Sequence, residues 1–223
     1  MMLLLIAAAL WLFIHLGIAG TRLRDAVVAR LGEGRFILFF SIASFATIVL
    51  LVIGWQNAGT AFLWSAPDWL RWVLAIVMLP AFVLFMASHK RNPTAVGNKG
   101  LGEEPRGIQR VTRHPMLWSF AIWALVHLIA NGDSASLVFF GTFAATALAG
   151  MPSIDAKLAR RHGAAWQAFA SKSSIMPFGA ILAGRNRFVL SEIGWMPPVV
   201  GLVLWAALLH FHRTIFGVPA LIL

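Results

Sequence analysis

Long apolar stretches alternate along this chain with loops that hold almost all of its positive charge. The apolar stretches occupy residues 1–20, 36–56, 69–88, 115–130, 135–151 and 193–212. Each is close to the ~20 residues that an α-helix needs to cross ~30 Å of hydrocarbon at a rise of ~1.5 Å per residue. The sequence therefore predicts an all-α protein: a polytopic transmembrane bundle of about six helices, with short helices at the cytoplasmic interface.

The distribution of Lys and Arg predicts how these helices are oriented. Loops 22–35, 90–113 and 157–187 hold four, six and six of the eighteen basic residues, which leaves Arg71 and Arg213 outside. Cytoplasmic loops of membrane proteins carry an excess of Lys and Arg. The three basic loops are therefore predicted to be cytoplasmic. Both termini then face the opposite side, in agreement with an even number of crossings.

Composition narrows the classes of function. The chain of 223 residues is 60% hydrophobic and 12% charged, whereas soluble domains carry about 25% charged residues. We attribute the net charge of +10 to helix orientation and to contact with anionic lipid headgroups, so the expected partner is the lipid bilayer and not nucleic acid. Cysteine is absent, so ligation of a metal or haem is left to His, Met and carboxylates. We treat residues 1–223 as a single transmembrane domain.

Two histidines, His15 and His127, fall inside predicted crossings. An ionisable side chain at membrane depth is a functional hypothesis by default, and the alternative is a neutral histidine hydrogen-bonded across helices. Two neutral imidazoles from different helices can clamp a haem iron or a transition metal. From helix rise, His15 is expected ~9 Å and His127 ~19 Å from the cytoplasmic surface, so their depths differ by about 10 Å. His89 and His114 match each other better in depth.

A second group of candidate residues is polar and cytoplasmic. It comprises Glu103, Glu104, Arg113, His114, Asp155 and Arg160, with the aromatic residues Trp166 and Phe169 nearby in sequence. Arginines and helix N-termini bind anions, and aromatic rings stack on planar groups. The set could therefore hold a charged cofactor or headgroup, and the alternative is an ordinary solvated loop.

Local signals predict several boundaries. Segment 21–35 is amphipathic and predicts a short interfacial helix, along which Arg24 and Arg30 reach the aqueous surface. Residues 131–134, Asn-Gly-Asp-Ser, are typical of a tight turn followed by a helix N-cap. Ser153 is expected to cap a further helix that ends at Gly163, and residues 164–170 to form another.

Three stretches resemble the NnrU family of integral membrane proteins. They are Ile14-His15 followed by Gly17, Gly20 and Arg22; residues 110–133, RVTRHPMLWSFAIWALVHLIANGD; and residues 154–181, IDAKLARRHGAAWQAFASKSSIMPFGAI. The resemblance covers most of the chain. That family includes a plant carotene isomerase, so the resemblance implies an isomerase-like or redox membrane enzyme with an apolar lipid or polyene as substrate.

The resemblance also implies a cofactor and a setting. The plant isomerase binds haem b within the membrane through histidines, and the matching positions here are His15 and His127. Arg113 and His114 would be structural or would meet the haem propionates. A cysteine-dependent ligand change cannot be carried over, because this chain has no Cys. Bacterial members are associated with denitrification, which implies the bacterial inner membrane, periplasmic termini and nitrogen-oxide reductase components as partners.

Two alternatives remain. The chain is distantly similar to isoprenylcysteine carboxyl methyltransferases, which share an Arg-His-Pro at a helix start. That likeness would place S-adenosylmethionine at Arg113, His114 and the 155–178 segment. The paired glutamates of those enzymes have only Asp155 as a counterpart, which weakens the case for methyl transfer. The other alternative is a non-enzymatic membrane assembly factor, in which the histidines serve only packing.

Overall fold

The computed structural model describes residues 1–90, 92–95 and 100–221. Its helices are α1 (Met2–Leu12), the π-helix η1 (Phe13–Ile18), α2 (Arg22–Leu31), α3 (Glu33–Gln56), α4 (Asp68–Ala87), α5 (Ile108–Val111), α6 (Pro115–Asn131), α7 (Ser134–Ser171), α8 (Gly179–Leu182), α9 (Leu190–Ile193) and α10 (Met196–Phe216). No strand occurs among the described residues. An isolated β-bridge joins Phe62 to Asp133. The predicted all-α class is confirmed.

Six apolar helices correspond to the six predicted stretches. Helices α3, α4, α7 and α10 are long and apolar enough to cross a membrane. Helix α1 continues through η1 and bends by 81° into α2, and this bent pair is a fifth candidate. Helix α6 is apolar but has only 17 residues, a length of ~26 Å at the usual helical rise.

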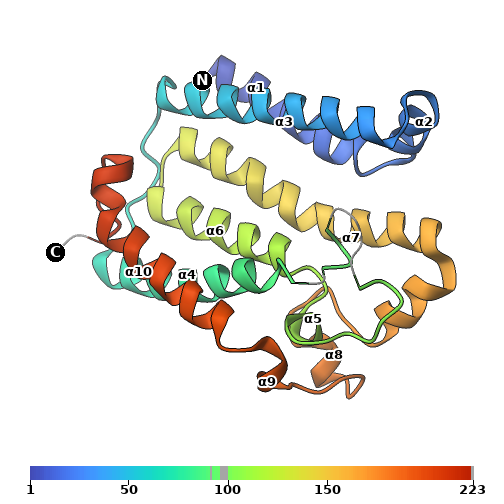
Figure 1. The fold of residues 1–223 in the computed structure, drawn as a ribbon. Coiled ribbons are helices and arrows are strands. Elements are labelled where there is room, and N and C mark those ends of the chain that lie inside the picture. The colour runs from blue at the N-terminus through green and yellow to red at the C-terminus, as the bar shows by residue number, and fades with distance from the viewer. Residues whose placement is uncertain (91, 96–99, 222–223) are drawn as a thin grey trace.

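The six apolar helices pack in the order α3, α1, α7, α6, α4 and α10, each mainly against its neighbours in that order. Figure 1 shows both termini at the left, at the end of the molecule away from α2. Two termini at one end agree with an even number of crossings. The side of the membrane that this end faces stays a prediction from the charge distribution.

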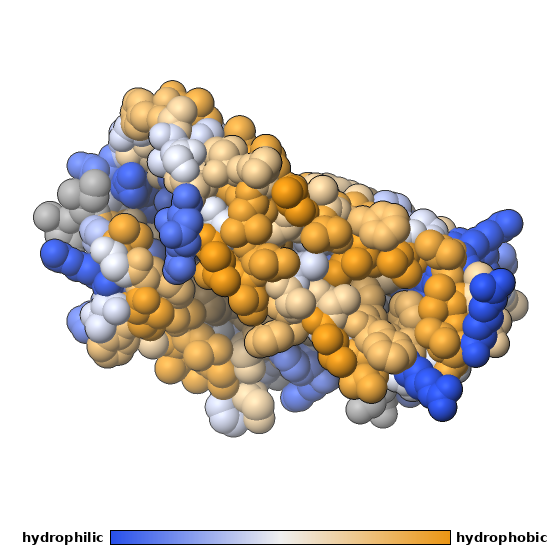
Figure 2. Space-filling view, turned by 90° about the horizontal axis from the view of Figure 1, so that it is seen from above, coloured by the Kyte–Doolittle hydropathy of each residue, from blue (hydrophilic) through white to orange (hydrophobic). Residues whose placement is uncertain are grey.

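Large apolar side chains cover much of the outer surface. Phe45 on α3 is 71% exposed and Val203 on α10 is 60% exposed. Figure 2 shows one face on which hydrophobic residues cover much of the area, while hydrophilic ones gather toward the ends. In a bilayer these side chains contact acyl chains, so their exposure is the expected arrangement for a membrane protein.

The predicted turn between α6 and α7 is confirmed. Gly132 has a left-handed backbone (φ 58°), and a Cβ there would lie 1.9 Å from the carbonyl oxygen of Trp64, so only glycine fits. The Asp133 side chain accepts a hydrogen bond from the backbone N–H of Ser136 at 2.9 Å and caps α7. The Leu63 N–H donates to the Gly132 carbonyl at 2.8 Å, which ties the α3–α4 loop to this turn.

Helix α7 is longer than predicted. It continues through Pro152 to Ser171, so the expected helix start at Ser153 is wrong. The Ser153 hydroxyl donates instead to the Gly20 carbonyl at 2.8 Å and joins α7 to the end of η1. The break expected at Gly163 is confirmed, because this residue has non-helical angles (φ 47°, ψ −118°).

The short helix predicted in segment 21–35 is present as α2, capped by the Thr21 hydroxyl. Arg24, which we expected at the aqueous surface, is buried. Its guanidinium bonds to Glu33 and lies 4.8 Å from the centre of the Phe36 ring, because α2 folds back on the start of α3. Arg91 and Lys99 of the second basic loop lie outside the described residues.

Candidate functional site

His15 lies on the π-helical turn η1. Its Nδ1–H donates to the Trp11 carbonyl at 2.9 Å, because a carbonyl oxygen can only accept. The ring stacks on Trp11 with centroids 3.8 Å apart and meets the edge of Phe40 at 5.1 Å. The bond at Nδ1 leaves the Nε2 lone pair available to a ligand or metal. Short π-helical turns are frequent at functional sites.

His127 lies on α6 among aromatic rings. Its Nδ1–H donates to the Trp123 carbonyl at 2.8 Å. The imidazole stacks on Phe140 of α7 with centroids 5.0 Å apart. As at His15, the hydrogen bond fixes the tautomer and leaves Nε2 as the acceptor nitrogen.

The structure does not bring His15 and His127 into direct contact. A chain of ring contacts joins them through Trp11, Phe143 and Trp123. The Trp11 indole, against which His15 stacks, donates to the Thr146 hydroxyl at 3.0 Å, whereas His127 stacks on Phe140. Those two positions on α7 are six residues, or ~9 Å, apart along the helix. The depth difference expected from the sequence therefore persists, and the role of both residues as haem ligands stays a prediction.

His212 on α10 was not among the predicted site residues. Its ring lies 6.4 Å from that of His127, with the two planes inclined by 22°. Its Nδ1–H donates to the Val218 carbonyl at 2.7 Å. One feature of the sequence could have indicated that His127 and His212 lie close together. His127 and His212 each stand one helical turn before the last residue of their helix, on the same predicted side of the membrane.

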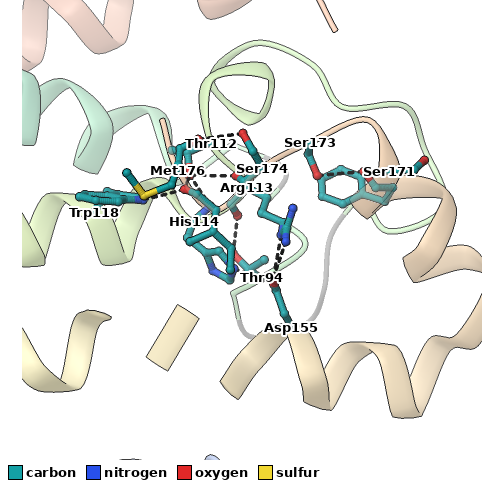
Figure 3. A network of polar contacts seen from close by, with 12 residues as sticks. Thr94, Thr112, Arg113, His114, Trp118, Asp155, Ser171, Ser173, Ser174 and Met176 are labelled. Atoms are coloured by element: carbon teal, nitrogen blue, oxygen red, sulfur yellow. Dashed lines mark hydrogen bonds and ion pairs between the residues drawn. The ribbon is translucent and has the colours of Figure 1, made fainter. Parts of the chain in front are cut away.

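Residues that the sequence predicted to be cytoplasmic form a buried network around Asp155 (Figure 3). Asp155 Oδ2 accepts from Arg113 Nη2 at 2.5 Å and from Nε at 2.9 Å. Asp155 Oδ1 accepts from His114 Nε2–H at 2.7 Å. The side chains of Arg113 and Asp155 are 13% and 14% exposed, and that of His114 is fully buried. The structure thus brings together three of the six predicted cluster residues.

The burial of His114 disfavours its charged form. Burial lowers the pKa of the His114 imidazole, although the hydrogen bond that His114 donates to Asp155 opposes this effect. Its Nδ1 is buried and has no hydrogen-bond partner among the described residues. With Nε2–H donated to Asp155, the free Nδ1 lone pair faces the interior.

Other cluster residues lie elsewhere or play a different part. Glu104 pairs with Lys172 at 2.5 Å, and Arg160 is exposed. The Trp166 ring centre lies 5.8 Å from the Arg113 guanidinium, and Phe169 packs beside Trp166.

Polar partners that sequence reasoning missed also hold the network around Asp155. Thr94 Oγ1 donates to the Arg113 carbonyl at 2.8 Å, the Arg113 N–H donates to the Ser174 carbonyl at 3.0 Å, and the Trp118 indole donates to the Ile175 carbonyl at 2.8 Å.

The opposite charges of Arg113 and Asp155 in this network compensate each other. The Arg113 guanidinium is committed to Asp155, and both carboxylate oxygens of Asp155 are occupied. A methyl-donor cofactor with an ammonium and a carboxylate needs complementary charges that are free to bind it. Arg113 and Asp155 do not offer such charges in this arrangement. The network fits a structural joint between the start of α6 and α7.

Comparison with known proteins assigns the chain to a family. The sequence model of the family described as NnrU protein matches residues 3–220. This chain belongs to the NnrU family.

Two curated relatives of this NnrU-family chain are plant proteins. It is 26% identical over 192 residues to the 15-cis-zeta-carotene isomerase, chloroplastic, of Zea mays. It is 29% identical over 198 residues to the protein of the same name from Arabidopsis thaliana. The alignments cover 82% and 83% of this chain and 51% of each relative, so the chain spans about half the length of these relatives. No solved structure matches it.

Proposed function

We propose that this NnrU-family protein is a membrane-embedded isomerase that changes the geometry of a double bond in a long apolar polyene. The observation that carries the proposal is similarity over four-fifths of the chain to proteins named 15-cis-zeta-carotene isomerase. The structure adds support, since the apolar helices form a row whose outer faces expose large apolar side chains. A polyene dissolved in the bilayer can reach such a surface without passing through water.

We further propose haem b as the cofactor, and the residues that would hold its iron are His127 and His15, the two histidines that the family resemblance implies. The donor chemistry supports this. Both imidazoles donate Nδ1–H to a backbone carbonyl, which orients the ring and raises the basicity of Nε2 toward a metal. A bound haem supplies one-electron chemistry at its iron, and a double bond that transiently gains or loses one electron rotates more easily.

The residues of the chain would provide an apolar, ordered surround for this chemistry. Around His127, the rings of Trp123, Phe140 and Phe143 form consecutive edge and stacking contacts. Such a surround excludes water and offers apolar faces to a polyene. Isomerisation leaves the composition of the substrate unchanged, so the overall reaction needs no net oxidant or reductant.

The proposed setting is the bacterial inner membrane, with the three basic loops in the cytoplasm and both termini in the periplasm. The denitrification role implied by the resemblance concerns the same iron, because nitric oxide is a ligand of ferrous haem. Nitrogen-oxide reductase components would then be partners. The two roles differ in the molecule that would reach the iron, which is a polyene in the isomerase role and nitric oxide in the denitrification role.

The test is conversion of 15-cis-zeta-carotene by the haem-loaded protein in liposomes, under reducing and oxidising conditions. We expect the 15-cis isomer to disappear and an isomer with a trans double bond at carbon 15 to accumulate, as measured by chromatography. His127→Ala should lower the rate at least tenfold, while His210→Ala, an exposed histidine outside the site, should leave it unchanged. Absence of conversion by haem-loaded wild type under both conditions rejects the isomerase proposal. A ferrous spectrum that shifts with nitric oxide in that protein would then favour the alternative role.

A further inference from the structure

A cleft lined by basic side chains opens beside the short helices α8 and α9. Figure 1 shows these helices outside the row of apolar helices, at the lower edge of the view. The cleft has a volume of about 420 Å³, within the ~300–1,000 Å³ that is usual for ligand sites. Its charged lining comes from segments far apart in the sequence, namely Glu104, Arg110, Lys172, Arg185 and Arg187. The proposed isomerase activity makes no use of this cleft.

Two of the four cations that line the cleft are paired with carboxylates. Arg110 Nε lies 2.7 Å from a carboxylate oxygen of Glu192, and Lys172 Nζ lies 2.5 Å from one of Glu104. A cation that is already bonded to a carboxylate has little charge left for a ligand. These two pairs therefore border the cleft without giving it a net charge.

The other two cations, Arg185 and Arg187, have no such compensation. Among the described residues, no carboxylate forms an ion pair with either arginine, and both arginines are exposed. The sequence explains this, because no Asp or Glu occurs from residue 156 to residue 191. The cleft therefore has an excess of positive charge that is free to attract an anion.

Asn186, between the two free arginines, holds this part of the chain in place. Its Nδ2–H donates to the Lys172 carbonyl at 2.7 Å. Its Oδ1 accepts from the Arg187 N–H at 2.8 Å and from Arg110 Nη1 at 2.5 Å. The loop after α8 is thereby tied to the end of α7 and to α5. The cleft is thus built by side chains that bond one another across three segments.

The free arginines keep donors available for a ligand. Arg185 Nη1 donates to the carbonyls of Ser171 at 2.6 Å and Ser173 at 3.1 Å, which fixes the position of the guanidinium. Its Nε and Nη2 have no hydrogen-bond partner among the described residues, and neither has the Arg187 side chain. A guanidinium donates well to the several oxygens of a phosphate group.

Exposed apolar side chains occupy the same segment as these arginines. Leu182 is 84% exposed and Leu190 is 65% exposed. The rings of Phe178 and Phe188 lie 6.3 Å apart, and both side chains are about half exposed. A segment that combines free arginines with exposed apolar side chains is typical of the membrane surface, where charged groups meet headgroups and apolar groups enter the acyl layer.

We infer that this cleft binds the phosphate of an anionic phospholipid at Arg185 and Arg187, with Leu182 and Leu190 against its acyl chains. A soluble phosphate would leave these apolar side chains in water. A choline headgroup would add its own positive charge to a cleft that already has an excess. The cytoplasmic surface, which the third basic loop is predicted to face, is rich in anionic lipid. The inference goes beyond the proposed function and needs neither haem nor a polyene.

The test measures binding of lipid to the purified full chain in detergent by native mass spectrometry. The probes are phosphatidylglycerol and phosphatidylcholine with the same acyl chains. Wild type should bind phosphatidylglycerol roughly tenfold more tightly, the effect expected of one charge-assisted hydrogen bond. Equal affinities for the two lipids overturn the inference.

Arg187→Gln removes one free guanidinium that has no described partner, so the variant should fold and keep the thermal midpoint of wild type. It should weaken phosphatidylglycerol binding roughly tenfold and leave phosphatidylcholine binding unchanged. Arg30→Gln is the matched control, because Arg30 is exposed in the first basic loop and its loss lowers the net charge equally. Equal losses in both variants would show that overall charge attracts the lipid, which rejects a site at the cleft. Wild-type affinity in Arg187→Gln rejects it as well.

Two further measurements separate a lipid from a soluble phosphate. Leu182→Ala should weaken phosphatidylglycerol binding, whereas Leu38→Ala, which removes an exposed leucine of α3, should not. Glycerol 3-phosphate has the phosphate without acyl chains and should fail to displace the lipid. Displacement by glycerol 3-phosphate at concentrations like those of the lipid, or no effect of Leu182→Ala, would mean that acyl chains contribute nothing and would contradict the lipid assignment.

Discussion

Asp155 joins two segments that are far apart in sequence. One carboxylate receives two hydrogen bonds from Arg113 and one from His114, and all three side chains are largely or fully buried. Burying a charge costs free energy that only a well-placed partner offsets, so removing one member leaves the other uncompensated. The network therefore fixes the start of α6 against α7 and fixes the orientation of α6 on which His127 depends.

Asp155→Asn should lower the free energy of unfolding by about 3 kcal/mol, because the buried Arg113 loses its charged partner. The measurement is the thermal midpoint in detergent, followed by size-exclusion chromatography. Arg160→Ala, an exposed residue on the same helix, is the control and should change the stability by less than about 0.5 kcal/mol. Equal midpoints for Asp155→Asn and wild type would show that the network contributes nothing to stability.

Glu192 on α9 is the acceptor of a second, more exposed network. Its oxygens accept from Arg110 Nε at 2.7 Å and Nη2 at 2.9 Å, and from the Gly107 N–H at 2.8 Å. These bonds, with Arg110 first, lower the pKa of Glu192 from 4.5 to about 2. The carboxylate therefore stabilises the folded state above pH 4.5, and this contribution is lost as the pH falls from 4.5 toward 2.

Glu192→Gln removes this contribution at every pH. The stability difference between wild type and variant should be largest above pH 4.5, about 1 kcal/mol for a solvent-screened pair, and should shrink toward pH 2. Thermal midpoints recorded at a series of pH values from 3 to 7 test this. A difference that stays constant over that range would mean that the charge of Glu192 does not stabilise the fold.

At the scale of elements, small residues decide how closely the helices approach. A Cβ at Gly54 on α3 would lie 2.9 Å from the backbone of Leu4 on α1, and Gly201 plays the same part between α10 and α4. Interfaces of this kind in membranes rely on close packing, because lipid tails provide no hydrophobic drive between helices. The close packing of α1 against α3 therefore requires glycine at position 54, because a larger side chain would collide with the backbone of Leu4.

Gly54→Ala should force α1 and α3 apart and lower the stability by about 2 kcal/mol, the usual range for overpacking. Gly34→Ala on the same helix is the matched control, because nothing lies within 4 Å of a Cβ there. It should leave stability unchanged or slightly raised, since alanine favours helix. The two thermal midpoints in detergent decide the matter, and equal midpoints would contradict tight α1–α3 packing.

At the scale of the whole molecule, a row of six apolar helices presents apolar surface on its outer faces and collects its polar loops at the ends. Such a shape is stable only where acyl chains cover the exposed side chains. The positive charge then selects one of the two possible orientations in the membrane. Both termini leave the bundle at the same end.

Reporter fusions test this orientation. Alkaline phosphatase fused after Leu221 should be active, and a fluorescent protein fused there should be dark, because that end is predicted to be periplasmic. The opposite pattern is expected for fusions after Gly184, in the third basic loop. A fluorescent C-terminal fusion would reverse the predicted topology and would place His127 and His212 toward the cytoplasm.

Hydropathy and charge predicted the helices because both are local properties. In hydrocarbon each backbone polar group must be paired within its own helix, so an apolar run of ~20 residues has few alternatives. The cap at Asp133 was predictable for the same reason, since a cap involves only the next three residues. The stretches predicted for α1 together with η1, and for α3, α4 and α6, end within a few residues of the observed helices.

Contacts between distant residues could not be predicted in this way. The burial of Arg24 depends on how α2 folds back on α3. Serine often caps helices, but the Ser153 hydroxyl donates instead to the Gly20 carbonyl. The proximity of His212 to His127 arises because α6 and α10 share α4 as a neighbour. Helix formation is settled within one or two turns of chain, whereas these contacts depend on the packing of whole helices, which no short window of sequence contains.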